Sequence, residues 1–341
     1  MSRLSDTPIC AADGLRPATS SRIDYIDLAK GVCIVLVVFN HCGFQFTDRF
    51  YLLQHLRMPL YFFISGLFFR DYGGLAKTML RKADRLLLPL ALFTAIAIAT
   101  GAVVRISRGE PLVMSDYISD GQIHVTGLWF LLCLFWQSMI CHALVTSVKP
   151  ALARIGITAL IGSCGILLAH TVATFPLHID SALTTFPFYY FGYSMKGAAM
   201  LTSQREPTRE IPIALLLLLT ACAIGFLNNS GTIAYYVNQY SGSAIMSLLQ
   251  SAAMVIAVLL LLKQIGRLPI LSYVGRFSLI VLGLHGIVSS VVITLGDMAG
   301  IGLTPATLSL AVLTLSALSI EPLRRLLPHF TAQRNLLSRG I

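Results

Sequence analysis

The stretch "YIDLAKGVCIVLVVFNHCGF", residues 25–44, is apolar enough to enter a membrane, yet it carries charges at its start and an imidazole well inside. A membrane-crossing helix needs about 20 mostly apolar residues. Similar apolar runs fill nearly the whole 341-residue chain, of which 56% is hydrophobic and only 12% is charged. Because a soluble protein would have about a quarter of its residues charged, the composition predicts an all-α polytopic membrane protein.

This stretch and the apolar runs that follow it along the chain predict about ten transmembrane helices in one membrane domain. Their centres lie near residues 37, 61, 95, 137, 162, 190, 219, 253, 284 and 313. The sixth and eighth runs are interrupted or flanked by polar residues. We expect an N-terminal tail at residues 1–21, a single transmembrane domain at 22–327 and a C-terminal tail at 328–341.

The basic residues predict how the chain is oriented in the membrane. If the N-terminus is cytoplasmic, 21 of the 25 Lys and Arg residues fall in cytoplasmic segments. The outer side then keeps only Arg49, Arg57, Arg105 and Arg108. Since cytoplasmic loops carry an excess of Lys and Arg, both termini are predicted to be cytoplasmic. The basic residues of the cytoplasmic segments account for the net charge of +10, so we expect membrane lipids and no nucleic acid as partners.

The seven cysteines are scattered, and most lie in or beside apolar runs. Their spacing resembles neither a metal site nor a disulfide framework. We therefore expect packing roles for them and no bound metal.

The first apolar run carries its polar residues on one face. A spacing of 11 or 14 residues returns to nearly the same side of an α-helix, so Asp27, Lys30, Ile34, Val38 and His41 form one stripe. His41 would lie roughly 20 Å from the helix start. Ionisable residues at such depth usually face a cavity or pathway, which predicts a functional His41; the alternative is a structural histidine bonded to a neighbouring helix.

Asn40 adds polarity beside this histidine. Asp27 and Lys30 could equally be interfacial charges that extend to the lipid headgroups. Further along, Trp129 opens the fourth run as an interface anchor or a substrate platform, and His285 lies near mid-membrane in the ninth run.

Two loop regions could bind ligands. The segment "RKADRLLLP", residues 81–89, places Arg81, Lys82 and Arg85 together, either to set the topology or to bind phosphate. The outer loop at 227–243 contains "LNNSGTIAYYVNQYSG". Its amide and aromatic side chains suit a sugar, but they also suit an interfacial aromatic belt.

The quoted residues resemble a known family. The segment "RIDYIDLAKGVCIVLVVFNH" followed by "RMPLYFFISGLFF" is similar to the first two helices of the acyltransferase-3 family of integral membrane O-acyltransferases. The Asp-x-x-Lys-Gly pattern resembles the fucose O-acetylase-like branch. The segments "RKADRLLLP", "LWFLLCLF", "LSYVGRFSLIVLGLHG" and "SIEPLRRLL" resemble later blocks in the expected order, so the resemblance covers about residues 22–327.

This resemblance implies transfer of an acyl group, usually acetyl, from cytosolic acyl-CoA to a hydroxyl of an extracytoplasmic sugar. The acceptor would be a glycan or a lipid-linked sugar, the location a bacterial inner membrane, and no cofactor would be bound permanently. The family's catalytic histidine, basic residue and aspartate match His41, Lys30 and Asp27. One position departs from the family pattern: Arg57 stands where the branch commonly has a histidine before Met-Pro. The nearby His55 would point about 160° away from that position on the helix, so it would not replace this histidine.

The implied chemistry suits the residues. A hydroxyl is a poor nucleophile at neutral pH, so a general base is required, and a neutral histidine can serve. We expect His41 in that role. Asp27 is expected near the CoA entrance, where it would hold Lys30, Arg22 or a loop cation. Lys30, Arg81, Lys82 and Arg85 are expected to bind CoA phosphates, and Asn40, Arg57, Trp129 and His285 to contact the substrates.

Two other functions compete with this prediction. A secondary transporter of a sugar-like or anionic solute would also have about ten helices and a mid-membrane charge. Transporters usually show repeated halves with paired broken helices, which this sequence lacks. A scaffold subunit of a glycan-assembly complex would not need His41 at that depth.

Overall fold

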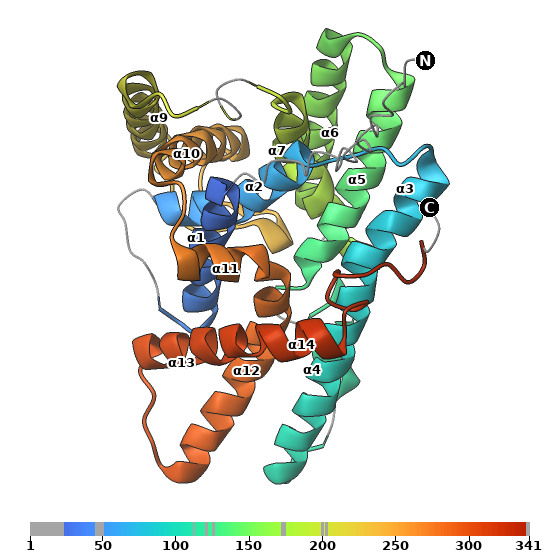
Figure 1. The fold of residues 1–341 in the computed structure, drawn as a ribbon, viewed down its shortest axis with the longest axis vertical. Coiled ribbons are helices and arrows are strands. Elements are labelled where there is room, and N and C mark those ends of the chain that lie inside the picture. The colour runs from blue at the N-terminus through green and yellow to red at the C-terminus, as the bar shows by residue number, and fades with distance from the viewer. Residues whose placement is uncertain are drawn as a thin grey trace, which may run out of the picture.

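The computed structural model describes residues 24–44, 51–111, 113–119, 122–124, 127–171, 175–198, 201 and 204–338. These residues form almost only helices, which confirms the predicted all-α class (Figure 1). The α-helices and one π-helix, in chain order, are α1 (Asp24–His41), α2 (Leu52–Leu67), α3 (Leu75–Lys82), the π-helix η1 (Ala83–Leu87), α4 (Leu88–Ser107), α5 (Trp129–Ser147), α6 (Ala151–Thr171), α7 (Ile179–Ser194), α9 (Pro207–Leu227), α10 (Ala244–Ile265), α11 (Pro269–Arg276), α12 (Ser278–Ala299), α13 (Pro305–Leu318) and α14 (Ile320–Leu326).

The remaining elements are short and lie in the connections. Two antiparallel hairpins pair β1 (Ile118–Ser119) with β2 (Gln122–Ile123) and β3 (Ile233–Ala234) with β4 (Gln239–Tyr240). The 3-10 turns are η2 (Met114–Asp116), η3 (Pro176–His178) and η4 (Tyr235–Val237). Both hairpins belong to loops that are predicted to face outward.

Seven helices in the described part of the chain are long and apolar enough to cross a membrane, so the protein is a multi-pass membrane protein. They contain seven of the ten predicted centres, and α3, η1 and α4 together form one of them, Leu75–Ser107. The other three centres fall on α1, α2 and α7. The three predicted centres therefore do lie in helices, but these helices are not among the seven. Both α2 and α7 are too short for a full span, and α1 carries too many charged residues, three in all.

The three helices α1, α2 and α7 occupy the middle of the bundle. With 16 residues each, α2 and α7 are about 24 Å long, less than a hydrocarbon core of about 30 Å. They pack closely because Gly66 of α2 and Gly192 of α7 face each other's backbone, where a Cβ atom would overlap the carbonyl groups of Tyr189 and Phe63. Short, closely packed helices therefore form the centre of the bundle.

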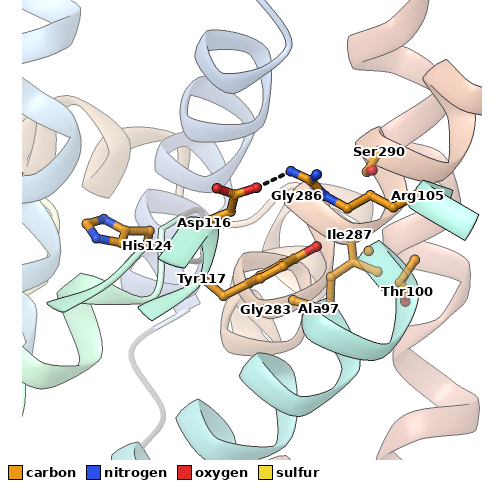
Figure 2. A pocket seen from close by; sticks show the side chains of 11 residues that line it. Ala97, Thr100, Arg105, Asp116, Tyr117, His124, Gly283, Gly286, Ile287 and Ser290 are labelled. Atoms are coloured by element: carbon orange, nitrogen blue, oxygen red, sulfur yellow. Dashed lines mark hydrogen bonds and ion pairs between the residues drawn. The ribbon is translucent and has the colours of Figure 1, made fainter. Parts of the chain in front are cut away.

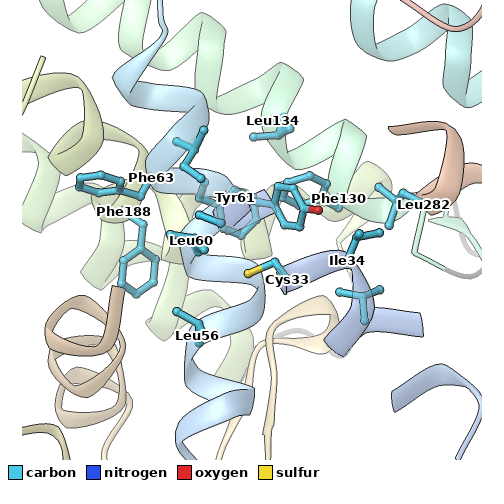
Figure 3. Packing of buried hydrophobic residues seen from close by; sticks show 14 of the residues in the cluster. Cys33, Ile34, Leu56, Leu60, Tyr61, Phe63, Phe130, Leu134, Phe188 and Leu282 are labelled. Atoms are coloured by element: carbon cyan, nitrogen blue, oxygen red, sulfur yellow. The ribbon is translucent and has the colours of Figure 1, made fainter. Parts of the chain in front are cut away.

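An apolar core fills the space between the ends of these central helices (Figure 3). Ile34, Leu60, Phe62 and Phe63 are fully or almost fully buried. By contrast, α6 and α9 bury only 17% and 22% of their apolar windows. Such helices can face lipid, while the central ones carry the polar residues discussed below. We call the end with Lys30 and α3 the inner end and the end with His41 the outer end, following the predicted topology.

Candidate active site

A cavity of about 280 Å³ lies at the outer end of α1 and α2. Four of the predicted site residues line it: Asn40, His41, Arg57 and Trp129. They come from α1, α2 and α5, whose ends meet here. The rest of the lining is formed by Val37, Gln54, Met58 and residues 232–236 of the outer loop.

His41 is the last residue of α1, and its side chain is exposed where it lines the cavity. The helix ends there and does not continue as a longer span, so the imidazole stands at a helix end. Its ring centroid lies 5.0 Å from that of His285, with the rings tilted by 46°. The structure thus brings together the two histidines that the sequence placed at membrane depth in helices far apart in the chain.

His285 lies behind His41 and is completely buried. Its Nδ1 atom is 2.7 Å from the carbonyl oxygen of Leu282, which can only accept, so Nδ1 carries the proton and Nε2 has a free lone pair. That Nε2 atom is buried and has no hydrogen-bond partner among the described residues. A buried acceptor without a donor is uncommon and is typical of a functional site.

Arg57 projects from α2 into the same cavity and is partly buried. Within the described ranges it forms no hydrogen bond or ion pair, so its five N–H donors are available to a bound group. The nearby His55 is directed elsewhere, as its angular position on the helix predicts. It is 1% exposed, and its Nδ1 lies 2.9 Å from the Ser251 hydroxyl of α10.

The outer loop between α9 and α10 contributes residues 232–236 to the lining of the cavity. Tyr235 is buried, and its hydroxyl lies 2.7 Å from that of Ser251, so one network joins this loop, His55 and α10. Burial raises the pKa of the Tyr235 phenol above its usual range, so the phenol stays protonated. Tyr236 is about half exposed and faces the Trp129 ring at 6.4 Å.

Trp129 lines the cavity at the first turn of α5. The His178 ring lies 5.9 Å from it, and the His178 Nδ1 atom is 3.2 Å from the Tyr236 carbonyl oxygen. His178, which the sequence analysis did not single out, thus supports the aromatic wall. Of the two sequence interpretations of Trp129, this position favours the substrate platform.

A second cavity, of about 270 Å³, lies between α4 and α12 under the other outer loop (Figure 2). Arg105 pairs with Asp116 at its edge, and Tyr117 and His124 complete the polar wall. None of the predicted site residues lines it. The cavity containing His41 is therefore the stronger candidate for the reacting centre.

The predicted phosphate-binding cations gather at the inner end, around the last residues of α2. The Lys30 and Lys82 ammonium groups lie 5.8 Å and 5.5 Å from the ring centroids of Phe68 and Phe69, respectively. Lys196, which we did not predict, donates to the Phe69 carbonyl at 3.1 Å. Three lysines from α1, α3 and the end of α7 thus surround one helix terminus, whose carbonyl dipoles attract cations.

The other predicted inner residues lie near this lysine cluster or beside it. The Arg81 guanidinium stacks on Tyr72 at 5.6 Å, and Arg85 is exposed. Asp27 instead lines a separate cavity of about 200 Å³ with Arg267 and Arg276 of the α10–α11 region. Asp27 thus shares a cavity with cations of a neighbouring segment and lies far from His41. Arg22, one of its expected partners, lies outside the described residues.

The stripe on α1 does not form an open passage. Ile34 and Val38, which separate Lys30 from His41, are both fully buried in the apolar core. This face therefore does not line a continuous pathway between Lys30 and His41. Its two polar ends, about 16 Å apart along the helix, are separated by packed side chains.

Sequence reasoning missed several lining residues. Gln54 is one of them: its Oε1 accepts from the Ile233 backbone N–H at 3.4 Å, which connects α2 to the outer loop. Thr232, Tyr235 and Tyr236 belong to the loop whose Asn- and Tyr-rich composition was the available signal. Within the described residues no group of His, Cys, Asp and Glu could hold a metal ion.

Comparison with known families agrees with this arrangement. Residues 23–320 match the model of the acyltransferase-3 family, described as an acyltransferase domain. Among curated proteins, none matches the chain. The match does not distinguish the fucose O-acetylase-like branch, which stays a prediction, and it gives no support to the transporter alternative. The chain therefore belongs to the acyltransferase-3 family and is a multi-pass membrane acyltransferase.

Proposed function

We propose that the protein transfers an acyl group, most simply acetyl, from cytosolic acyl-CoA to a hydroxyl of an extracytoplasmic sugar or surface glycan. The observation that carries the proposal is the outer cavity in which exposed His41, the uncompensated Arg57 guanidinium and aromatic walls meet. Hydroxyl acceptors need a base, and sugar rings stack on aromatic faces. The family membership supports acyl transfer, and the composition of this cavity supports the choice of acceptor.

The proposed reaction begins when His41 accepts the proton of the acceptor hydroxyl. The hydroxyl oxygen attacks the thioester carbonyl carbon, and the negative charge that develops on the carbonyl oxygen faces Arg57. The carbon–sulfur bond then breaks, and the CoA thiolate takes the proton back from the imidazolium. Arg57 would act only when charge develops, which is how preorganised donors lower a barrier.

His285 would orient the base in this scheme. Its unpartnered Nε2 can accept the N–H of His41, which leaves the other His41 nitrogen as the acceptor for the hydroxyl proton. In this role His285 is a positioning residue and does not contact the sugar, which differs from the substrate contact expected from the sequence.

The donor would be bound at the inner end. Lys30, Arg81, Lys82 and Arg85, together with Lys196, supply positive charge for the CoA phosphates, and the Phe68–Phe69 pair supplies an apolar surface. Because Ile34 and Val38 close the direct path, the acyl arm could reach His41 only after the core between α1 and α2 opens.

The test is reconstitution of the purified protein in liposomes with acetyl-CoA on one side and a candidate glycan on the other. We expect release of free CoA thiol and formation of an O-acyl ester on the glycan. Both products should form only when acetyl-CoA and the glycan are on opposite sides of the membrane. Passage of a solute with no thiol release, whatever the acceptor, would contradict the proposal.

A further inference from the structure

The outer loop between α9 and α10 borders a second cavity, of about 490 Å³, which we call the neighbouring cavity. Thr232 and Ala234 line both this cavity and the one that contains His41, so the two lie next to each other along β3. Cavities that hold small ligands usually measure about 300–1,000 Å³. The neighbouring cavity falls within that range, whereas the cavity with His41, of about 280 Å³, lies just below it. A ligand larger than the reacting sugar therefore has room beside it.

The neighbouring cavity is lined by polar side chains that carry no charge. Its polar lining residues are Thr232, Asn238, Gln239, Tyr240 and Ser241, and the others are alanine and glycine. Hydroxyl and amide groups both donate and accept hydrogen bonds, as the hydroxyl groups of a sugar do. A phosphate or a carboxylate would instead be held by Arg or Lys, and neither is among the described lining residues. The chemistry of the cavity therefore favours a neutral ligand with several hydroxyl groups.

Two of these residues hold the loop in place. The buried Asn238 donates from Nδ2 to the Thr184 hydroxyl at 2.8 Å and to the Gly165 carbonyl oxygen at 3.0 Å, which anchors the loop on α7 and α6. Its Oδ1 accepts from the Tyr240 hydroxyl at 3.0 Å. The wall of the cavity is therefore formed before a ligand binds, so less conformational freedom is lost on binding.

Gln239 and Thr232 are left to contact a ligand. Both side chains are exposed, and neither forms a hydrogen bond with another described residue. The register of β3 and β4 pairs Gln239 with Ala234, and paired residues of neighbouring strands lie on the same face of the hairpin. The small Ala234 side chain leaves space beside the Gln239 amide. Thr232 thus offers a hydroxyl at the boundary of the two cavities, and Gln239 offers an amide in the neighbouring one.

We propose that the neighbouring cavity is a subsite for a second sugar of the acceptor, next to the sugar that is acylated. The acceptor is then a neutral oligosaccharide or the end of a neutral glycan, and Gln239 and Thr232 hold its second sugar by hydrogen bonds. This inference rests on the proposed function, because it assumes that a sugar hydroxyl reacts at His41. It adds the length and the charge of the acceptor, which the proposed function leaves open.

The experiment measures acetyl transfer by the purified full chain to three sets of acceptors. These are methyl glycosides of glucose, galactose and mannose, the corresponding neutral disaccharides, and disaccharides whose second sugar is a uronic acid. The value of kcat/KM should be about tenfold higher for a neutral disaccharide than for its monosaccharide, the gain from one or two hydrogen bonds. A uronic acid as the second sugar should remove most of this gain, because no described lining residue is a cation that would pair with it.

Gln239→Ala tests the subsite separately from the cavity with His41. The ratio of kcat/KM between disaccharide and monosaccharide should fall about threefold to tenfold, since only the disaccharide reaches the Gln239 amide. Thr232→Val, which removes a hydroxyl and keeps the shape of the side chain, should give a smaller fall. Gln333→Ala is the matched control, because it changes an exposed glutamine beyond α14 and should leave the ratio unchanged.

The outcomes separate this inference from the proposed function. Equal kcat/KM values for monosaccharides and disaccharides, a preference for the uronic acid acceptors, or an equal loss with both lengths in Gln239→Ala would overturn the subsite, while acyl transfer to a sugar would stand. If no acceptor receives an acetyl group and no CoA thiol is released in their presence, the proposed function fails, and the subsite fails with it.

Discussion

The outer cavity and the inner cation cluster occupy opposite ends of the same two helices. At the outer end, α1 and α2 supply an imidazole, two amides and one arginine, which line a cavity with aromatic walls. At the inner end they supply Lys30 and the Phe68–Phe69 pair, around which further cations gather. This difference supports the proposal that proton transfer occurs at the outer end and anion binding at the inner end. The short central helices bring these ends close together.

The largest expected effect is that of His41→Ala. Loss of the proposed general base should lower kcat about 10²- to 10⁴-fold and leave the KM for acetyl-CoA near its original value. The measurement is steady-state thiol release in detergent. His124→Ala, which changes an exposed outer histidine away from this cavity, serves as the matched control and should retain activity.

The next largest effect should follow Arg57→Met. If the guanidinium faces the developing oxyanion, kcat should fall about 10²- to 10³-fold, as for loss of one oxyanion donor. Arg57→Lys should recover part of the rate because it keeps the charge. A pure rise in the acceptor KM with unchanged kcat would instead assign Arg57 to substrate binding. The control is Arg108→Met, since Arg108 pairs with Asp297 outside the cavity.

Lys82→Met tests the inner end. Removing one cation should raise the KM for acetyl-CoA about tenfold with little change in kcat, and the loss should shrink at high ionic strength because salt screens phosphate contacts. Lys149→Met changes an exposed lysine in the neighbouring α5–α6 connection and should leave the KM unchanged. A lower kcat without a change in KM would remove the distinction between the two ends.

Tyr236→Ala should have the smallest effect. This half-exposed ring would stack on the acceptor sugar, and its loss should raise the acceptor KM by about threefold to tenfold. Tyr236→Phe keeps the ring face and should behave like the wild type. An equal rise of the acceptor KM in both variants would assign the acceptor contact to the Tyr236 hydroxyl and not to its ring.

Much of the fold follows from the sequence because hydropathy is a local property. All ten predicted centres lie in described helices. The interior helices were harder to interpret from the sequence. Both α2 and α7 are shorter than a full span, and no local pattern indicates that they lie at the centre. Their central packing becomes visible only in the structure, where Gly66 and Gly192 allow the two helices to come into contact.

The site was predicted in part, for the same physical reason. Helical spacing placed Lys30 and His41 on one face, but it could not show that Ile34 and Val38 would be packed between them. The contact of His41 with His285 joins residues more than 240 positions apart. No local pattern reports such contacts, so the pairing of His41 with His285 is seen only in the three-dimensional arrangement.

The most direct test of this division of labour is an acetyl-CoA titration of His41→Ala beside Lys82→Met. The account predicts crossed results: His41→Ala binds acetyl-CoA like the wild type but forms ester at least 10²-fold more slowly, while Lys82→Met needs more donor and reaches a similar maximal rate. Ester formation by His41→Ala at the wild-type rate would contradict the central claim that this histidine is the base.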